Sequence, residues 1–95
     1  MTGVLIISGG SRGIGAATAI CAARDGWDVA INYARDKTAA SSVADQVRAL
    51  GQRAIIVKAD MSNETDIQRL FDETETELGS LKGLVTSAGT TGKTA

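Results

Sequence analysis

A glycine-rich turn near the start of the chain has the composition of a phosphate-binding site. Residues 8–15 read Ser-Gly-Gly-Ser-Arg-Gly-Ile-Gly and lie between an apolar run at residues 4–7 and a segment with helical spacing. Glycine permits positive φ and leaves room for a phosphate beside backbone N–H groups, and the dipole of a following helix favours an anion. Glycines also serve ordinary tight turns, but a position between a strand and a helix predicts the phosphate-binding role.

The segments around this turn alternate between strand and helix signals. Short apolar runs predict four strands, at residues 4–7, from residue 29, at residues 54–57 and at residues 81–86. Three segments with helical spacing lie between them, and each is followed by a glycine, as helix ends often are. Strands that alternate with helices predict an α/β domain with a parallel sheet and right-handed crossovers.

Helix caps and helix faces can be predicted in the same way. Asp36 or Thr38 can cap the second helix, and Ser62 or Asn63 the third. The residues that recur at helical spacing are Ile14, Ala17, Thr18 and Cys21 in the first helix, Ala40, Val43, Ala44, Val47 and Leu50 in the second, and Ile67, Leu70, Phe71, Thr74 and Leu78 in the third. The second and third sets are expected to face the sheet, and Cys21 is expected to be a small buried residue.

The composition limits the classes of function. The 95 residues contain no histidine and one cysteine, which excludes an intrachain disulfide, a histidine base and an imidazole metal site, and no metal site is expected. The net charge of -1 and the scattered basic residues give no electrostatic reason to expect binding to nucleic acid or to an anionic membrane. No apolar run could span a bilayer, and no basic segment precedes the first one, so a cytoplasmic protein is expected.

The glycine spacing resembles that of the short-chain dehydrogenase/reductase family. The family motif is Thr-Gly-x-x-x-Gly-x-Gly, and here Ser8 replaces the threonine and keeps its hydroxyl. A second family motif, Asn-Asn-Ala-Gly, corresponds to Thr-Ser-Ala-Gly at residues 86–89. The resemblance covers the whole chain and implies a Rossmann-type doubly wound parallel sheet. Residues 1–95 would be its N-terminal dinucleotide-binding portion, incomplete, with three helices and four strands in the order 3-2-1-4.

The resemblance implies cofactor-binding roles at the ends of all four strands. Asp60 would accept a hydrogen bond from the adenine amino group, with the Met61 backbone beside it, and an ordinary turn aspartate is the alternative for Asp60. Ala88 and Gly89 match the family motif and allow close approach of the cofactor. The cofactor-binding residues expected are Gly9, Ser11, Arg12, Gly13, Ile14, Gly15, Asn32, Tyr33, Arg35, Asp60, Met61, Ser87, Ala88 and Gly89.

The residues after the second strand favour NADP over NAD. In dinucleotide sites an acid at the end of this strand binds the ribose 2′-hydroxyl of NAD. Tyr33 takes that place here, and Arg12 and Arg35 flank the same pocket, where guanidinium groups can bind a 2′-phosphate. Two alternatives remain. Asp36 could reach the pocket if the strand runs one or two residues further, and the two arginines could be solvated surface charges.

Two matches to other motifs are rejected. Tyr33 and Lys37 spell Tyr-x-x-x-Lys, which is the family's catalytic pair, but they follow the second strand at the adenosine end, whereas the family's pair comes after strand four. Residues 92–94, Gly-Lys-Thr, resemble the end of a P-loop, but residue 87 is serine instead of the required glycine. No catalytic residue is therefore expected within the chain.

The resemblance implies the NADP-binding part of an oxidoreductase that transfers a hydride between a nicotinamide cofactor and a small carbonyl or secondary alcohol. The run Asn-Tyr-Ala-Arg at residues 32–35 resembles the 3-oxoacyl-acyl-carrier-protein reductase and glucose dehydrogenase branches. Family members are usually dimers or tetramers, which implies a homo-oligomer. The fourth strand is expected to be an exposed sheet edge. The alternatives are a non-catalytic nucleotide-binding module and an inactive truncated fragment.

Overall fold

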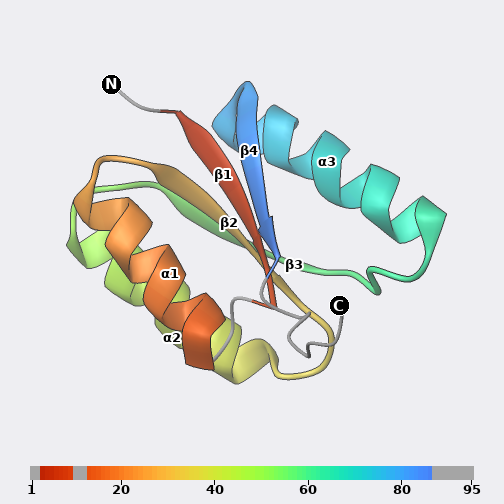
Figure 1. Ribbon diagram of the computed structural model, residues 1–95, viewed down its shortest axis with the longest axis horizontal. Helices are drawn as coiled ribbons and strands as arrows, with labels where there is room; N and C mark the ends of the chain where they lie inside the picture. Colours follow the sequence, from red (N-terminus) through yellow and green to blue (C-terminus); the bar gives the residue numbers. More distant parts are fainter. Residues whose placement is uncertain (1–2, 10–12, 87–95) are drawn as a thin grey trace.

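The computed structural model describes residues 3–9 and 13–86, which form a four-stranded sheet with helices on both faces (Figure 1). The elements in chain order are β1 (Val4–Ser8), α1 (Gly13–Arg24), β2 (Asp28–Tyr33), α2 (Lys37–Ala49), β3 (Ala54–Lys58), α3 (Glu64–Leu78) and β4 (Leu81–Thr86). The strand order is β3-β2-β1-β4, and every neighbouring pair is parallel. The predicted α/β class and the predicted order 3-2-1-4 are therefore confirmed.

The carboxyl ends of the strands meet at one edge of the sheet. Tyr33 pairs with Lys58, and Ser8 pairs with Thr86. The turn after β1, the loop after β2 and the loop after β3 therefore all leave the sheet at this carboxyl edge. Ligands of open α/β sheets bind outside the carboxyl ends of the strands, so the register places the predicted site residues where such a ligand would lie.

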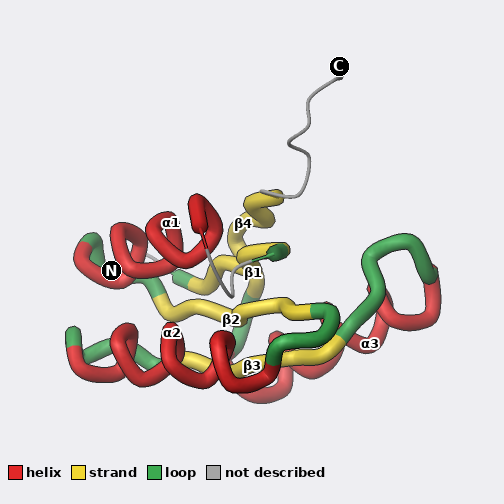
Figure 2. Tube along the Cα trace, turned by 90° about the horizontal axis from the view of Figure 1, so that it is seen from below, coloured by secondary structure: helices red, strands yellow, loops and turns green. Residues whose placement is uncertain are grey.

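The sheet separates two hydrophobic layers, with α1 and α2 on one face and α3 on the other (Figure 2). Alternate residues of each strand point to opposite faces. Ile7, Val29 and Ile31 pack under α1 and α2. Val4, Ile6, Ala30 and Val57 pack with α3, with its Leu70 fully buried. Both faces of β1, β2 and β3 are thus covered, which explains why apolar residues run without interruption through most of these strands.

The buried face of α1 is not the one marked by the residues that recur at helical spacing in this segment. Its buried residues are Gly15, Ala19, Ala22 and Ala23, whereas Ile14 is 79% exposed. Cys21 is also exposed, so the prediction that this residue is buried is wrong. The helix turns its smallest residues toward the sheet, and hydrophobicity alone did not indicate that orientation because alanine and glycine contribute little to an apolar pattern.

The caps of α2 and α3 agree with one alternative of each prediction. Asp36 Oδ1 accepts from the Ala39 N–H at 2.9 Å, and Asn63 Oδ1 accepts from the Asp66 N–H at 3.1 Å. Leu50 was expected on the inner face of α2, but it is the C-cap residue and is 42% exposed. That expectation is wrong because the helix ends one residue earlier, at Ala49.

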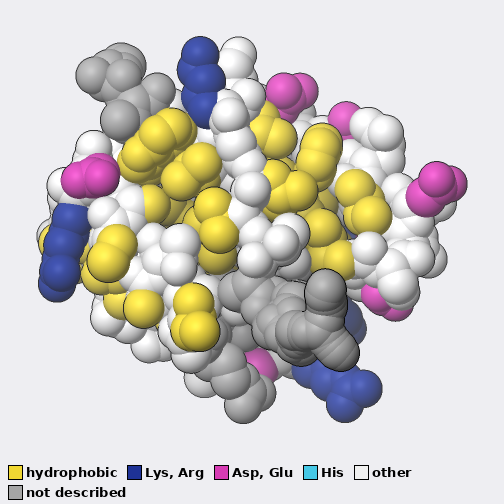
Figure 3. All heavy atoms as spheres, in the orientation of Figure 1, with side chains coloured by type: hydrophobic (Ala, Val, Ile, Leu, Met, Phe, Trp, Pro, Cys, Tyr) yellow, Lys and Arg dark blue, Asp and Glu magenta, His cyan; other side chains and the backbone are white. Residues whose placement is uncertain are grey.

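The strand β4 lies at an edge of the sheet, as predicted, and in the described part of the chain it pairs with β1 alone. Its register with β1 shifts between Val4 and Leu5, so Leu84 pairs with Ile6 and is 43% exposed. Figure 3, in the orientation of Figure 1, shows hydrophobic side chains on the viewed face of the molecule, on both sides of the line along which β4 runs in Figure 1. Within the described ranges, no helix has the length and apolar character needed to cross a membrane.

Candidate cofactor-binding site

The two described glycines that flank residues 10–12, after β1, have backbone conformations that favour glycine. Gly9 has φ of 70° and Gly13 has φ of 62°, both in the left-handed region that favours glycine. Helix α1 begins at Gly13, so its first N–H groups open toward the carboxyl edge of the sheet. The predicted residues Ser11 and Arg12 lie outside the described residues.

Behind the turn, a buried amide side chain connects three strands. Asn32 of β2 is 3% exposed, and its Nδ2 donates to the Ala59 carbonyl at 3.0 Å and to the Val57 carbonyl at 3.4 Å. Its Oδ1 accepts from the Ser8 hydroxyl of β1 at 3.4 Å. The Asn32 side chain, predicted to bind cofactor, is thus occupied inside the protein. It holds the start of the phosphate turn and the end of β3 together.

The residues after β2 separate into a buried tyrosine and an exposed arginine. Tyr33 is 7% exposed and packs in the hydrophobic layer beneath α1 and α2, whereas Arg35 lies exposed in the loop. The strand ends at Tyr33, and Asp36 Oδ1 serves as the N-cap of α2. This placement disfavours the alternative in which Asp36 moves into the ribose pocket. Burial of the Tyr33 side chain also agrees with rejecting it as a catalytic acid or base.

Asp60 lies exposed just after β3, and its carboxylate is held by the next turn. Asp60 Oδ1 accepts from the Ser62 hydroxyl at 2.6 Å and from the Ser62 N–H at 2.9 Å. The hydrogen bond from the Ser62 hydroxyl and then the one from its N–H lower the pKa of Asp60 from its ordinary value. The lowered pKa favours the ionised carboxylate. Because both bonds from Ser62 use Oδ1, Oδ2 can accept from a ligand.

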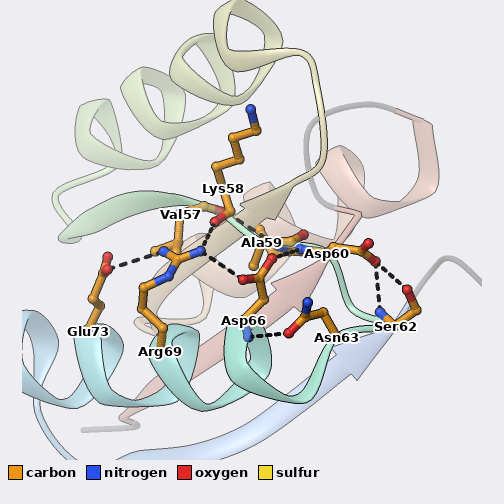
Figure 4. Close-up of polar contacts among 10 residues, drawn as sticks. Val57, Lys58, Ala59, Asp60, Ser62, Asn63, Asp66, Arg69 and Glu73 are labelled. Carbon is orange, nitrogen blue, oxygen red and sulfur yellow. Dashed lines mark hydrogen bonds and ion pairs between the residues drawn. The ribbon is translucent and has the colours of Figure 1, made fainter.

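An ion-pair network from α3 supports the Asp60 backbone (Figure 4). Asp66 Oδ2 accepts from the Asp60 N–H at 2.8 Å, and the other oxygen of Asp66 lies 3.7 Å from Arg69. Arg69 in turn donates to the Lys58 carbonyl at 2.6 Å and pairs with Glu73 at 3.3 Å. The loop between β3 and α3 is therefore fastened to the first two turns of the helix.

A cavity of about 650 Å³ lies between the loops after β2 and β3. Its lining residues are Ala34, Arg35, Lys58, Ala59, Asp60, Asp66 and Arg69. The cavity brings together Arg35 and Asp60, which the sequence assigned to the ribose and the adenine. Its size lies within the usual range for small-molecule sites. A larger hollow of about 830 Å³ on the outer face of α3 is lined by residues of that helix alone, and the strand ends contribute nothing to it.

The described residues therefore fit the adenosine end of a dinucleotide. The glycine turn offers N–H groups to phosphate, Asp60 offers an acceptor to a base, and the cavity adds cationic groups. Ile14, at the start of α1, and Met61, after Asp60, also lie at this edge. The predicted residues Ser87, Ala88 and Gly89 lie outside the described ranges. In the part of the chain that is described, no group of three or more cysteine or acidic side chains could hold a metal ion.

Several residues of this site were missed by the sequence analysis, namely Lys58, Ser62, Asp66 and Arg69. The spacing of Asp66, Arg69 and Glu73 is a signal for ion pairs along one helix face. Nothing in that spacing shows that Arg69 also reaches the Lys58 carbonyl or that Asp66 receives the Asp60 N–H. Those contacts depend on how the helix packs against the sheet.

Comparison with known proteins shows the family to which the chain belongs. The short chain dehydrogenase family matches residues 3–95. The chain is 38% identical over 86 residues to a short chain dehydrogenase, claC, of Passalora fulva, covering 90% of this chain and 32% of that protein. It is 39% identical over 88 residues to a 3-oxoacyl-acyl-carrier-protein reductase of Synechocystis, covering 93% of this chain and 36% of that protein.

Solved structures show the same fold. An acetoin dehydrogenase from Enterobacter cloacae matches with a TM-score of 0.85 and 31% identity, covering 94% of this chain and 35% of that one. A short-chain dehydrogenase/reductase variant from Serratia marcescens matches with a TM-score of 0.82 and 34% identity, covering 86% of this chain and 34% of that one. The chain spans about a third of the length of these relatives.

The strand order, the glycine turn after β1 and the match over residues 3–95 lead to one conclusion. The chain belongs to the short chain dehydrogenase family and corresponds to its N-terminal, nicotinamide-cofactor-binding region.

Proposed function

We propose that the chain is the NADP-binding part of an oxidoreductase that transfers a hydride between the cofactor and a small carbonyl or secondary alcohol. The observation that carries this proposal is the meeting of the glycine turn and Asp60 at the carboxyl edge of one parallel sheet, in a chain of this family. The whole protein's substrate, its homo-oligomeric state and its cytoplasmic location are proposed on the family relationship. The curated relatives include 3-oxoacyl-acyl-carrier-protein reductases, which favours a carbonyl substrate.

In this proposal each part of the site holds one part of the dinucleotide. The N–H groups of the turn from Gly9 to Gly15, with the start of α1, bind the diphosphate. Asp60 accepts from the adenine amino group, and Met61 lies against the base. When bound, the cofactor supplies the nicotinamide ring that gives or takes the hydride. The groups that transfer the proton lie outside residues 1–95. Tyr33, the tyrosine of the rejected Tyr-x-x-x-Lys match, is buried and so is poorly placed to reach a substrate.

Preference for NADP follows from the charges around the ribose position. Where an acid would bind the 2′-hydroxyl, Tyr33 is turned into the hydrophobic layer. Arg35 lines the cavity together with Lys58 and Arg69, so the cavity contains three cationic side chains and two carboxylates. Asp66 is paired with Arg69, and Asp60 is assigned to the base. Arg35 and Lys58 therefore remain to bind a 2′-phosphate, together with Arg12 of the turn.

The substitution Arg35→Asp tests the cofactor preference in the protein that carries this chain. Loss of a charge-assisted phosphate contact is expected to weaken NADPH binding by about tenfold or more. The dissociation constant for NADH should change little. Arg24→Asp makes the same change of charge at the far end of α1 and serves as the control. Calorimetry measures the dissociation constants of NADPH and NADH in the unmutated protein and in both variants. Equal affinity of the unmutated protein for NADPH and NADH would contradict the proposal.

A further inference from the structure

The peptide group that joins Ala59 to Asp60 is held at both of its polar atoms by side chains. Its carbonyl oxygen accepts from Asn32 Nδ2 at 3.0 Å, and its N–H donates to Asp66 Oδ2 at 2.8 Å. Asn32 belongs to β2 and Asp66 to α3, so the two contacts come from different elements. A peptide plane fixed at both ends cannot rotate without breaking one of these bonds.

The two side chains are themselves held in place. Asn32 is buried, and its Oδ1 accepts from the Ser8 hydroxyl at 3.4 Å. Asp66 has its own N–H bound to the Asn63 cap, and its carboxylate pairs with Arg69 at 3.7 Å. Figure 4 shows the Asp66 side chain directed at the Asp60 backbone, with Arg69 on its other side. The negative charge of Asp66 is thus compensated locally and does not need to be matched by the ligand.

We propose that Asn32 and Asp66 are positioning residues that orient Asp60 so that its carboxylate selects an adenine base. The direction of a side chain follows the orientation of the peptide before it. With the 59–60 peptide fixed and Oδ1 bound to Ser62, the remaining oxygen of Asp60 has one preferred direction. This inference rests on the proposed dinucleotide-binding function, and it assigns to Asn32 a role different from contact with the cofactor.

The ratio of affinities for two cofactors that differ only in the base tests this role, because a general loss of stability would not change that ratio. Hypoxanthine carries a carbonyl oxygen, an acceptor, where adenine has its 6-amino group, so an oriented carboxylate should reject it. The probes are NADP⁺ and its hypoxanthine analogue, titrated calorimetrically into the protein that carries this chain. We expect the unmutated protein to prefer the adenine form by about tenfold or more.

Asp66→Ala removes the acceptor for the Asp60 N–H on the first turn of α3. The preference for adenine should fall at least about threefold, mainly through weaker binding of NADP⁺. Asp66→Asn keeps an acceptor oxygen but removes the charge, so it should retain the preference. Asn32→Ala should lower the preference like Asp66→Ala. Glu64→Ala, also in the first turn of α3, is the matched control and should leave both affinities unchanged.

The possible outcomes separate this inference from the function on which it rests. If the unmutated protein binds neither probe, the dinucleotide-binding function and this inference both fail. If the unmutated protein prefers adenine and Asp66→Ala keeps the full preference, the positioning role alone is wrong. An equal loss of affinity for both probes would also overturn it, since that would indicate a purely structural role. Melting temperatures of all variants identify any that fail to fold. If Asp66→Ala fails to fold, Asn32→Ala measured against Glu64→Ala gives the same comparison, because Asn32→Ala is expected to lower the preference.

Discussion

Replacing Gly13 with alanine should separate the stability of the fold from the binding of phosphate. Gly13 is the first residue of α1 and has φ of 62°. Among the described residues, no heavy atom outside its chain neighbours lies within 4 Å of where a Cβ would stand. Within the described residues, and apart from its chain neighbours and its own helix backbone, the added methyl group meets no steric obstacle. Its effect on stability is therefore expected to come from the backbone conformation.

The size of that effect can be worked out from the backbone angle. A residue that has a Cβ costs the folded state roughly 1–2 kcal/mol relative to glycine when its backbone is in the left-handed region. Part of this loss is offset because alanine restricts the unfolded chain, by about 0.4–1 kcal/mol. The net destabilisation should be about 1 kcal/mol, which corresponds to a fall in Tm of roughly 4–8 °C for a unit of this size. A change this small leaves the protein folded.

Gly51→Ala is the matched control. Gly51 follows α2 at the opposite edge of the sheet, has φ of 92°, and also has no described heavy atom within 4 Å of a Cβ position. It should lose as much stability as Gly13→Ala, or more. Calorimetry with NADPH should show affinity lowered about tenfold or more in Gly13→Ala, because a methyl group obstructs the phosphate, and no change in Gly51→Ala. Equal NADPH affinity in the two variants would refute the phosphate-binding role of the turn.

Two further outcomes follow from the site and the core. Ser62→Ala should raise the pKa of Asp60 toward its ordinary value, because the largest cause of the lowered pKa is the Ser62 hydroxyl. A carboxyl group whose pKa is lowered on folding stabilises the folded state at pH above its ordinary pKa, and this stabilisation is lost as the pH falls through the lowered pKa. The variant lacks part of this stabilisation, so its acid unfolding should begin at a slightly higher pH. Carboxyl NMR titration measures the shift, and an unmoved pKa would be contrary evidence. Leu70→Ala should destabilise the protein by about 2–5 kcal/mol, because this side chain is fully buried between α3 and the sheet. Urea denaturation measures the loss of stability, and a loss below about 1 kcal/mol would show that Leu70 is not tightly packed between α3 and the sheet.

The sequence was sufficient to predict the order and type of the elements. Continuous apolar runs in the strands, glycines after the helices and the capping residues Asp36 and Asn63 act locally, and local signals can be read without the fold. The glycine spacing also indicated a turn after the first strand, and Gly9 and Gly13 have positive φ there, a conformation that few other residues adopt readily.

Other features depended on packing and could not be predicted in the same way. The face of α1 was misjudged because Ala19, Ala22 and Ala23 are buried for their small size, while Ile14 is exposed. Asn32 was taken for a cofactor contact, but its side chain lies between strands that are separated by more than twenty residues in sequence. The contact of Asp66 with the Asp60 N–H likewise needs the docking of α3 against the sheet.

The central claim is that the carboxyl edge of this sheet binds the adenosine and phosphate groups of a nicotinamide dinucleotide. The most direct measurement is a titration of the ¹⁵N-labelled protein that carries this chain with NADPH, followed by amide chemical shifts. Binding at this edge should give the largest shifts at Gly9, Gly13 and Asp60, near the carboxyl ends of β1 and β3. Absence of shifts at saturating NADPH, or shifts confined to the opposite edge at Gly26 and Gly51, would contradict it.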